Sequence, residues 1–246
     1  MEFKGKVALI TGASVGIGRA AALQFAENGA AVVIVDWNEE TLSVAEQELK
    51  AITPDVLAVR CDVSKEEDVY AAVKAAEDRL GKVDILVNNA ALWRAWGPFI
   101  ESTTEEWKQY IDINVMGVVY FSKAVLTGML ERHWGRIINV ASVAGVYPKA
   151  NMVQYSATKA AVIAISSALA KEVTEQGVLV NTVSPGSVSD SANPDIDHHS
   201  PTGLCFMGRT GTDRENANLI CFLASEDASY IAGQNILIDG CRKTLA

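Results

Sequence analysis

Cysteine is scarce in this 246-residue chain, and the four cysteines are scattered. Cys61, Cys205, Cys221 and Cys241 lack the spacing of metal ligands, so we expect buried or incidental thiols and no zinc site or disulfide framework. The adjacent histidines His198 and His199 could suggest a metal site, but in a polar loop such a pair is typical of solvated side chains. We therefore expect no bound metal and a reduced, cytoplasmic setting.

Positively charged residues are also fewer than negatively charged ones. Lysine and arginine number 21 against 30 aspartates and glutamates, which gives a formal net charge of −9. Because polyanions need basic patches, this balance argues against a nucleic acid or an anionic membrane as partner. No apolar run is expected to be long enough to span a bilayer, and the residues 1–5 do not resemble a secretory signal.

The chain has enough apolar residues (49%) for a sizeable core, and strand-like runs alternate with helix-like patterns. We predict one α/β domain over 1–246, a Rossmann-type doubly wound parallel sheet of about seven strands with helices on both faces. The expected strands are Val7–Thr11, Ala31–Asp36, Val56–Cys61, Ile85–Asn88, Arg136–Val140, Val178–Val183 and Asn235–Ile238. The expected helices are Gly18–Asn28, Glu39–Ile52, Lys65–Leu80, Thr104–Arg132, Met152–Gln176 and Thr212–Ala224.

Two helix starts have recognisable caps. Ser64 with Glu67 fits a capping box for the third helix, and Thr103 or Thr104 can open the fourth.

A glycine-rich turn follows the first strand. Gly12, Gly16 and Gly18 let backbone N–H groups approach a pyrophosphate, and the helix N-terminus supplies partial positive charge. Glycines alone also fit an ordinary strand–helix turn. The second expected strand, however, ends in Asp36, whose carboxylate can accept hydrogen bonds from an adenosine ribose. Together these features predict a dinucleotide site.

A polar stretch without helical pattern extends from 187 to 209. A loop of this length at the carboxyl ends of the strands is either a lid over the substrate or a surface insertion, and we interpret it as a lid.

Candidate catalytic groups follow the fifth strand. Tyr155 and Lys159 lie four residues apart, on one face of a helix, and Ser142 lies at the carboxyl edge of the sheet. An ammonium beside a phenol favours the phenolate and lowers its pKa, and the serine hydroxyl can hold a carbonyl or alkoxide oxygen. A tyrosine and a lysine at this spacing are more often part of an ordinary amphipathic face.

The order of these motifs resembles the short-chain dehydrogenase/reductase family over essentially the whole length. The motifs are Thr11-Gly12-x-x-x-Gly16-x-Gly18, Cys61-Asp62-Val63, Asn88-Asn89-Ala90, Asn114, Ser142, Tyr155-x-x-x-Lys159 and Pro185-Gly186. The resemblance implies that Tyr155 is the general acid/base, that Lys159 lowers its pKa and holds the nicotinamide ribose, that Ser142 positions the substrate oxygen, and that Asn114 supports a proton relay through water. It also implies a homotetramer built partly from the two longest helices.

The resemblance further implies a set of cofactor-binding residues: Gly12, Ser14, Val15, Gly16, Ile17, Gly18, Asp36, Trp37, Asp62, Val63, Asn89, Ala90, Ala91, Tyr155, Lys159, Pro185, Gly186 and Val188. NAD(H) is expected rather than NADP(H), because Asp36 would repel a 2′-phosphate and neither Val15 nor Trp37 can pair with one. Arg19, just inside the first expected helix, is the cation near this position.

Two positions depart from the family pattern. Ala91 stands where the family usually has glycine, and its methyl group is tolerable only if the backbone there does not need positive φ. Asp190 stands where the family often has a threonine that hydrogen-bonds the carboxamide, so Ser187, Ser189 or Ser191 would have to substitute.

The expected substrate side is apolar and aromatic. Besides Ser142 and Tyr155, it includes Trp93, Ala144 and Tyr147, although Trp93 and Trp96 can equally pack against neighbouring loops. These residues suit a lipophilic or alicyclic alcohol or ketone, and the lid acids Asp190, Asp195 and Asp197 are a poor match for anionic substrates.

The sequence thus predicts an NAD(H)-dependent enzyme that interconverts a secondary alcohol and a ketone by hydride transfer. A 3-oxoacyl thioester reductase is the main alternative, with Lys171 and Arg132 meeting an acidic carrier. A non-catalytic nucleotide-binding regulator would be expected to lose the tyrosine, lysine or serine, and an epimerase would need a sugar-nucleotide domain for which there is no spare length.

Overall fold

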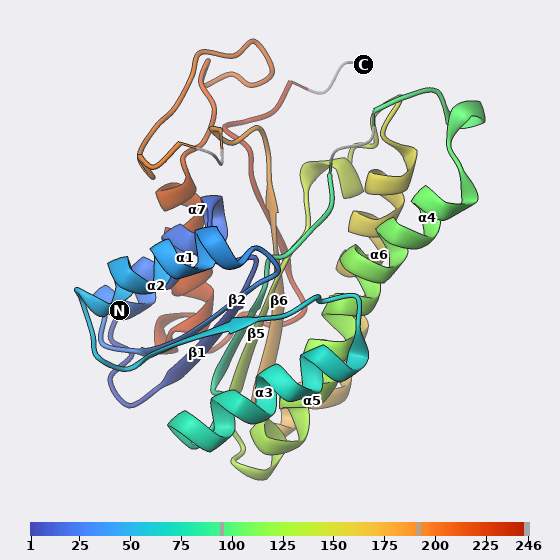
Figure 1. Cartoon of the computed structure of the whole chain (residues 1–246). Coiled ribbons are helices and arrows are strands. Elements are labelled where there is room, and N and C mark those ends of the chain that lie inside the picture. The colour runs from blue at the N-terminus through green and yellow to red at the C-terminus, as the bar shows by residue number, and fades with distance from the viewer. Residues whose placement is uncertain (94–95, 191–192, 244–246) are drawn as a thin grey trace.

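The computed structural model describes residues 1–93, 96–190 and 193–243, and it is built on a seven-stranded sheet (Figure 1). The strands are β1 (Val7–Thr11), β2 (Ala31–Asp36), β3 (Val56–Arg60), β4 (Ile85–Asn88), β5 (Gly135–Val140), β6 (Val178–Pro185) and β7 (Asn235–Ile238). The α-helices are α1 (Gly16–Glu27), α2 (Glu39–Lys50), α3 (Glu66–Leu80), α4 (Thr104–Ile111), α5 (Gly117–Glu131), α6 (Val153–Val173) and α7 (Asp213–Ala224). These elements confirm the predicted α/β class.

Both faces of the sheet are covered by helices (Figure 1). Successive side chains of a strand point to opposite faces, so an unbroken apolar strand needs a core on each side. In β1, Ala8 and Ile10 join the core under α1, α2 and α7, whereas Val7 and Leu9 join the core under α3, α5 and α6. The continuous apolar runs of the sequence are therefore explained by burial on both faces.

The strand order is β3-β2-β1-β4-β5-β6-β7, and every pair is parallel. The order reverses at β1, which pairs with β2 on one side and β4 on the other. Ligands of open α/β sheets bind beyond the carboxyl ends of the strands at such a reversal. The glycine-rich turn after β1 and the segment after β4 both begin at this point.

The predicted helix Thr104–Arg132 is interrupted. Residues Asp112–Met116 form a π-helical turn between α4 and α5, with Asn114 buried inside it. Thr103 forms the predicted capping box with Glu106 at the start of α4. The predicted box at α3 is wrong, because α3 begins after Lys65 and the Ser64 hydroxyl donates to Asp62 Oδ1 (2.7 Å).

One helix contradicts the expectation that no apolar run could span a bilayer. By length and composition alone, the 28-residue helix Thr104–Glu131, π-helical turn included, is long and apolar enough to cross a membrane. Its residues Phe121, Val125 and Met129 are fully or almost fully buried in the core on one face of the sheet. In this fold the helix therefore packs against the rest of the α/β core along one side.

Candidate active site

The turn after β1 has glycine where a side chain would not fit. Gly12 has φ +61°, and a Cβ built there would lie 2.8 Å from the Cα of Ala90. A Cβ on Gly18 would overlap the carbonyl oxygen of Gly12. The bare backbone thus allows α1 to pack tightly against the segment after β4, as a dinucleotide turn requires.

The N-terminus of α1 is left open. The helices α2, α4 and α7 begin with side-chain caps from Asn38, Thr103 and Thr212, whereas Val15 precedes α1 and supplies none. The first turn of α1 also contains no acidic residue. Uncapped N–H groups with the positive end of the helix dipole are suited to an anion, so this turn fits a pyrophosphate.

Asn89 holds the glycine-rich turn in place. Its side-chain amide donates to the carbonyl oxygens of Thr11 (3.0 Å) and Gly12 (2.9 Å), and the Thr11 hydroxyl accepts from the backbone N–H groups of Asn89 and Ala90. The sequence indicated Asn89 as a cofactor residue and Thr11 as the start of the glycine-rich motif, but it gave no signal that the two residues are hydrogen-bonded. The Asn89 side chain serves to join the carboxyl ends of β1 and β4.

Asp36 is the last residue of β2, and hydrogen bonds from neighbouring residues hold its carboxylate in place. Oδ2 accepts from the hydroxyl (2.7 Å) and backbone N–H (3.2 Å) of Ser14, and Oδ1 accepts from the N–H of Asn38 (3.1 Å). These bonds fix the negative charge beside the glycine-rich turn. Arg19 does not balance it, because its guanidinium forms a fork with the carboxylate of Glu48 at 2.7 and 2.9 Å.

The remaining residues expected around the adenine end lie at the same edge of the sheet. Asp62 follows β3 and uses Oδ1 to accept from Ser64, and Val63 is buried beside it. Val15 and Trp37 are exposed, with Trp37 at 69%. The structure therefore presents no cation at either of these two positions.

Ser142 and Tyr155 meet between β5 and α6. The backbone after β5 turns through Val143–Gly145, and the Ser142 hydroxyl hydrogen-bonds the Tyr155 side chain. A Cβ on Gly145 would lie 2.8 Å from the backbone nitrogen of Ala160 and from the carbonyl carbon of Lys159. Because this glycine lets the turn approach α6 closely, it helps set the position of the serine relative to the tyrosine.

Lys159 lies on the same face of α6 as Tyr155, with Nζ 5.8 Å from the centre of the phenol ring. Nζ donates to the carbonyl oxygen of Val140 at 2.8 Å, and the side chain is buried. Burial lowers the pKa of Lys159 to about 8.

The pKa of Tyr155 moves in the direction opposite to the one the sequence suggested. Burial raises it, and the hydrogen bond from Ser142 offsets only part of that increase. A protein interior penalises the charged form, and here the ammonium of Lys159 is directed to a carbonyl oxygen. The phenol is therefore protonated at neutral pH, the form that can donate to a carbonyl oxygen.

Asn114 uses its side chain structurally. Oδ1 accepts from the N–H of Leu92 (2.7 Å), while Nδ2 donates to the Leu92 carbonyl oxygen (2.9 Å) and the Thr158 hydroxyl (3.1 Å). Thr158 in turn donates to the carbonyl oxygen of Tyr155. The π-helical turn thus connects the segment after β4 to the helix that carries the tyrosine, a contact that the helical pattern did not predict.

Ala91 and Asp190 are the two departures from the family pattern. The described non-glycine residues with positive φ are His133, Asn151 and Cys241. The backbone at Ala91 therefore does not have the positive φ that would require glycine there. Burial raises the pKa of Asp213 to about 6, and the nearby carboxylate of Asp190 is a smaller cause of the same increase. Ser191, one of the suggested substitutes, lies outside the described residues.

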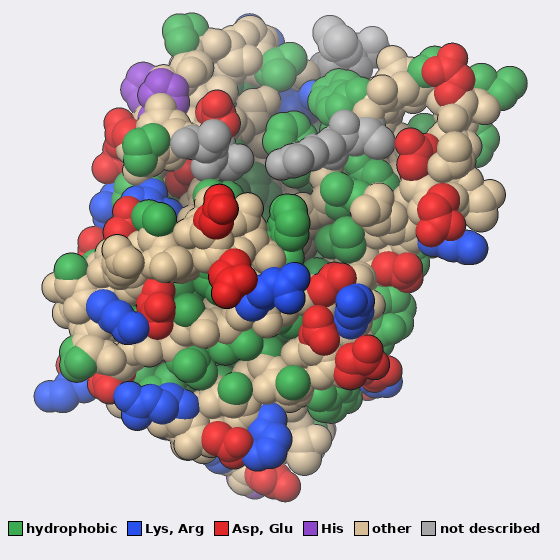
Figure 2. Space-filling model, in the orientation of Figure 1, with side chains coloured by type: hydrophobic (Ala, Val, Ile, Leu, Met, Phe, Trp, Pro, Cys, Tyr) green, Lys and Arg blue, Asp and Glu red, His purple; other side chains and the backbone are tan. Residues whose placement is uncertain are grey.

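The residues expected at the other cofactor and substrate positions lie at the same end of the sheet. Pro185 ends β6, Gly186 packs against Asp239, and Val188 pairs with Gly211. Ala144 is buried, and Tyr147, Trp93 and Trp96 are exposed. Figure 2 shows hydrophobic side chains gathered above the sheet, between the two upper parts of the molecule, with charges of both signs below.

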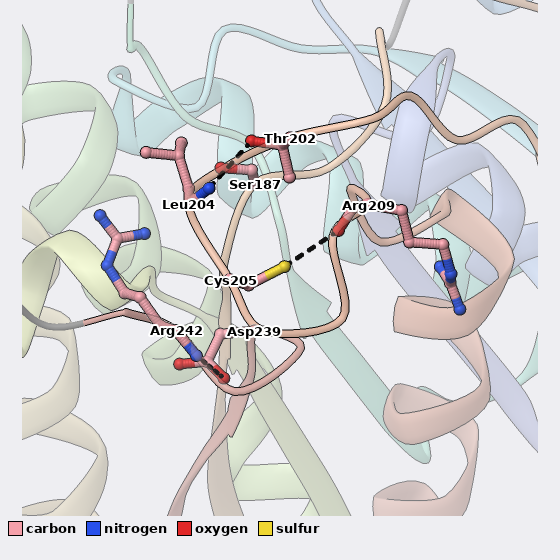
Figure 3. Close-up of a pocket in the computed structure, with 7 residues that line it drawn as sticks. All are labelled: Ser187, Thr202, Leu204, Cys205, Arg209, Asp239 and Arg242. Atoms are coloured by element: carbon pink, nitrogen blue, oxygen red, sulfur yellow. Dashed lines mark hydrogen bonds between the residues drawn. The ribbon is translucent and has the colours of Figure 1, made fainter.

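The segment predicted as a lid is held at both ends. Ser189 and Gly211 hydrogen-bond through their backbones, and Pro201 pairs with Arg209. Arg209 forms a fork with Glu215 at 2.9 and 2.6 Å, and this carboxylate also closes the capping box of α7. Leu204 and Cys205 line a small pocket with Asp239 and Arg242 (Figure 3). Among the described residues no group of three His, Cys, Asp or Glu could hold a metal ion.

The fold and this site define a nucleotide-binding oxidoreductase of the Rossmann type. A family model described as short chain dehydrogenase matches residues 6–200. The chain belongs to the short-chain dehydrogenase family, whose members use nicotinamide cofactors and act on CH–OH and C=O groups of small molecules.

Known proteins resemble the chain along nearly all of its length. It is 38% identical over 243 residues to the 3-oxoacyl-[acyl-carrier-protein] reductase FabG of Vibrio cholerae, covering 98% of both chains. It is 39% identical over 240 residues to the 2,5-dichloro-2,5-cyclohexadiene-1,4-diol dehydrogenase LinX of Sphingobium indicum, covering 96% of this chain and 95% of the relative. A crystal structure of NAD+-bound xylitol dehydrogenase superposes with a TM-score of 0.90 at 31% identity, covering 98% of this chain and 100% of that one.

Proposed function

We propose that this enzyme interconverts a secondary alcohol and a ketone, with NAD(H) as the hydride carrier and a lipophilic or alicyclic carbon skeleton as substrate. The observation that carries the proposal is the meeting of Ser142 and Tyr155 at the carboxyl edge of the sheet, with the buried ammonium of Lys159 behind the phenol. The uncapped start of α1 is suited to the cofactor pyrophosphate.

In this mechanism the bound cofactor supplies or accepts hydride at its nicotinamide ring. Ser142 and Tyr155 hold the substrate oxygen by two hydroxyl groups, and Tyr155 exchanges a proton with it. Because the phenol pKa is raised, Tyr155 starts ketone reduction in the donating form. Lys159 keeps a positive charge near the phenol and so stabilises the phenolate that remains after Tyr155 has donated its proton, with Asn114 fixing the neighbouring backbone.

The charge pattern supports NAD(H) over NADP(H). A 2′-phosphate would meet the fixed carboxylate of Asp36, and the guanidinium of Arg19 is engaged by Glu48. Val15 and Trp37 offer the phosphate no positive charge. The NAD+-bound state of the xylitol dehydrogenase neighbour is consistent with this choice.

A 3-oxoacyl thioester remains a second candidate substrate because of the similarity to the Vibrio cholerae reductase. The similarity to LinX, named for a cyclic diol, favours the alicyclic alternative. Of the two cations considered for an acidic carrier, Arg132 donates to the carbonyl oxygen of Val83 at 2.6 Å, so it is already engaged within the chain.

The change Tyr155→Phe tests the proposed chemistry. It removes the acid/base group while keeping the ring, so we expect turnover to fall by about 10²–10⁴-fold with nearly unchanged NADH affinity. Tyr230→Phe, at a fully exposed tyrosine, is the matched control. Turnover is measured by NADH absorbance over a panel of cyclic and acyclic ketones, and affinity by NADH fluorescence. Near-normal turnover in Tyr155→Phe would refute the assigned role.

We also propose a single catalytic domain over 1–246, with 187–209 as its substrate lid, and a homotetramer in solution. The backbone bridges at 188 and 201 give the lid a defined shape. Sedimentation measurements on the purified protein test the oligomeric state.

A further inference from the structure

Thr41 lies behind the carboxylate that is expected to select the cofactor, although no motif of the sequence indicated it. It belongs to the first turn of α2, where its backbone N–H donates to the side chain of the preceding cap residue Asn38 at 3.1 Å. The Thr41 hydroxyl donates to the Ser14 hydroxyl oxygen at 2.9 Å, and Ser14 donates to Asp36 Oδ2 at 2.7 Å. Side chains from the start of α2, the glycine-rich turn and the end of β2 thus form one hydrogen-bonded chain.

The direction of this chain of hydrogen bonds is fixed by its last member. An ionised carboxylate can only accept, so the single proton of the Ser14 hydroxyl is used in the bond to Asp36. Between the two hydroxyls, Thr41 must therefore be the donor. The other acceptor near the Thr41 hydroxyl is the carbonyl oxygen of Asn38, which at 3.4 Å is the weaker partner. Both hydroxyl protons point along the chain toward Asp36.

The same turn leaves the Asp36 carboxylate little freedom. Asp36 and Ser14 are 6% and 5% exposed. Besides the Ser14 hydroxyl, the backbone N–H of Ser14 donates to Oδ2 (3.2 Å) and that of Asn38 donates to Oδ1 (3.1 Å). A carboxylate offers about four lone-pair sites, so these bonds leave about one for an outside donor such as a ribose hydroxyl. The orientation of the carboxylate decides where that remaining site points.

The Thr41 hydroxyl strengthens the bond that follows it in the chain. A hydroxyl that accepts a hydrogen bond becomes a better donor, and this effect is larger in a low-dielectric interior than in water. No other group in the described part of the chain donates to the Ser14 hydroxyl oxygen. Without Thr41 this buried oxygen would lose its donor, and Ser14 would hold the carboxylate less firmly.

We propose that Thr41 is a positioning residue for cofactor selection, which holds the Ser14 hydroxyl toward Asp36 and so keeps the carboxylate turned to the adenosine ribose of NAD(H). The inference rests on the proposed use of NAD(H) and extends it to a residue of α2. NADP(H) gains nothing from this arrangement, because a 2′-phosphate needs donors and both hydroxyl protons are directed to Asp36. Because Thr41 acts through Asp36 and not on the reacting atoms, its loss should weaken cofactor binding and leave the chemical step unchanged.

The change Thr41→Val removes the hydroxyl and keeps the shape of the side chain. Losing one hydrogen bond between neutral groups should raise the KM for NADH by about 3- to 10-fold, with little change in kcat. The kcat/KM with NADPH should stay nearly constant, so the NADPH-to-NADH ratio of kcat/KM should rise by the same factor. Steady-state kinetics with both cofactors on one ketone measure these values.

Two further variants serve as controls. Thr41→Ser keeps the hydroxyl and should restore the wild-type KM for NADH. Thr53→Val removes a matched hydroxyl beyond the other end of α2, where it accepts from the N–H of Asp55 at 3.3 Å, and should leave the cofactor preference unchanged.

A double-mutant comparison separates positioning from a general loss of structure. In the Asp36→Ala background there is no carboxylate to position, so adding Thr41→Val should change the KM for NADH by less than about twofold. A weakened start of α2 would instead act equally in both backgrounds. Calorimetric titration with ADP-ribose and with its 2′-phosphate measures the preference without turnover. In Thr41→Val only the affinity for ADP-ribose should fall, by about 3- to 10-fold.

Unchanged affinity for ADP-ribose in Thr41→Val, or an equal loss for both ligands, would overturn the role of Thr41. An undiminished effect of Thr41→Val in the Asp36→Ala background would overturn it as well. A wild type that binds the 2′-phosphate form more tightly would overturn both this role and the preference for NAD(H). A wild type that binds ADP-ribose but reduces no ketone would refute the proposed alcohol–ketone chemistry, and the titrations would still decide the role of Thr41.

Discussion

Replacing Asp36 by asparagine tests how the enzyme selects its cofactor. The side chain keeps its shape and one oxygen acceptor but loses its negative charge. Three donors hold the carboxylate in the native protein: the hydroxyl and N–H of Ser14 and the N–H of Asn38. Because the Ser14 hydroxyl can rotate to accept instead of donate, most of this arrangement can persist around the amide.

The magnitude follows from simple electrostatics. Two unit charges about 6 Å apart near a protein surface repel by roughly 3 kcal/mol at an effective dielectric of about 20. At 1.36 kcal/mol per tenfold change, removing one charge raises the NADP(H)-to-NAD(H) ratio of kcat/KM by about 100-fold. The nearby guanidinium of Arg19 adds little, since Glu48 neutralises it.

The assay is steady-state kinetics with NADH and NADPH on one ketone, for the wild type, Asp36→Asn and the control Asp55→Asn. Asp55 is exposed and precedes β3, at the opposite edge of the sheet. The control should keep the wild-type ratio. If Asp36→Asn also keeps it while still using NADH efficiently, electrostatic exclusion of the 2′-phosphate is the wrong explanation.

Two other substitutions test the site. Lys159→Met should abolish most turnover. It should also raise the free energy of unfolding by about 1–3 kcal/mol at pH 7, because burial lowers the pKa of Lys159 to about 8 and holding its charged form in the folded protein therefore costs free energy. Between about pH 8 and 10.5 the lysine is protonated in the unfolded chain but not in the folded protein, so wild-type stability should rise with pH across this window. The stability gained by the methionine variant should shrink over the same window. Urea unfolding at pH 7 and 10 measures both effects, and a gain that does not change with pH would contradict this account. Gly145→Ala should cost about 1–3 kcal/mol and lower kcat, because its Cβ would lie 2.8 Å from the backbone of α6. Gly203→Ala, with open space around the added methyl group, is the control, and equal melting temperatures for the two variants would disprove the close contact.

Much of the fold could be read from local pattern. Strands β1, β2, β4 and β7 have the predicted bounds, because unbroken apolar runs between glycine- and asparagine-rich turns leave few alternatives. The sequence also placed the expected site residues at the carboxyl ends of parallel strands, which meet at one edge of the sheet. These residues are Gly12, Asp36, Ser142 and Tyr155. The periodicity of α6 placed Lys159 on the same face as the phenol.

Other features depended on contacts between distant segments. The π-helical turn at Asn114 is accompanied by hydrogen bonds to Leu92 and Thr158, which no helical period reveals. The raised pKa of Tyr155 comes from burial, which depends on the packed environment and not on the four-residue spacing to Lys159.

The sequence by itself determined the alternation of strands and helices, the glycine-rich turn and the residue types available for hydride-transfer chemistry, because these depend on periodicity and on side-chain chemistry. Tertiary structure alone decided which charges are neutralised and which are not. Arg19 meets Glu48 across 29 residues of sequence, and Arg136 meets Glu226 across 90. Charge acts through space, and only the folded chain sets the distances over which it acts.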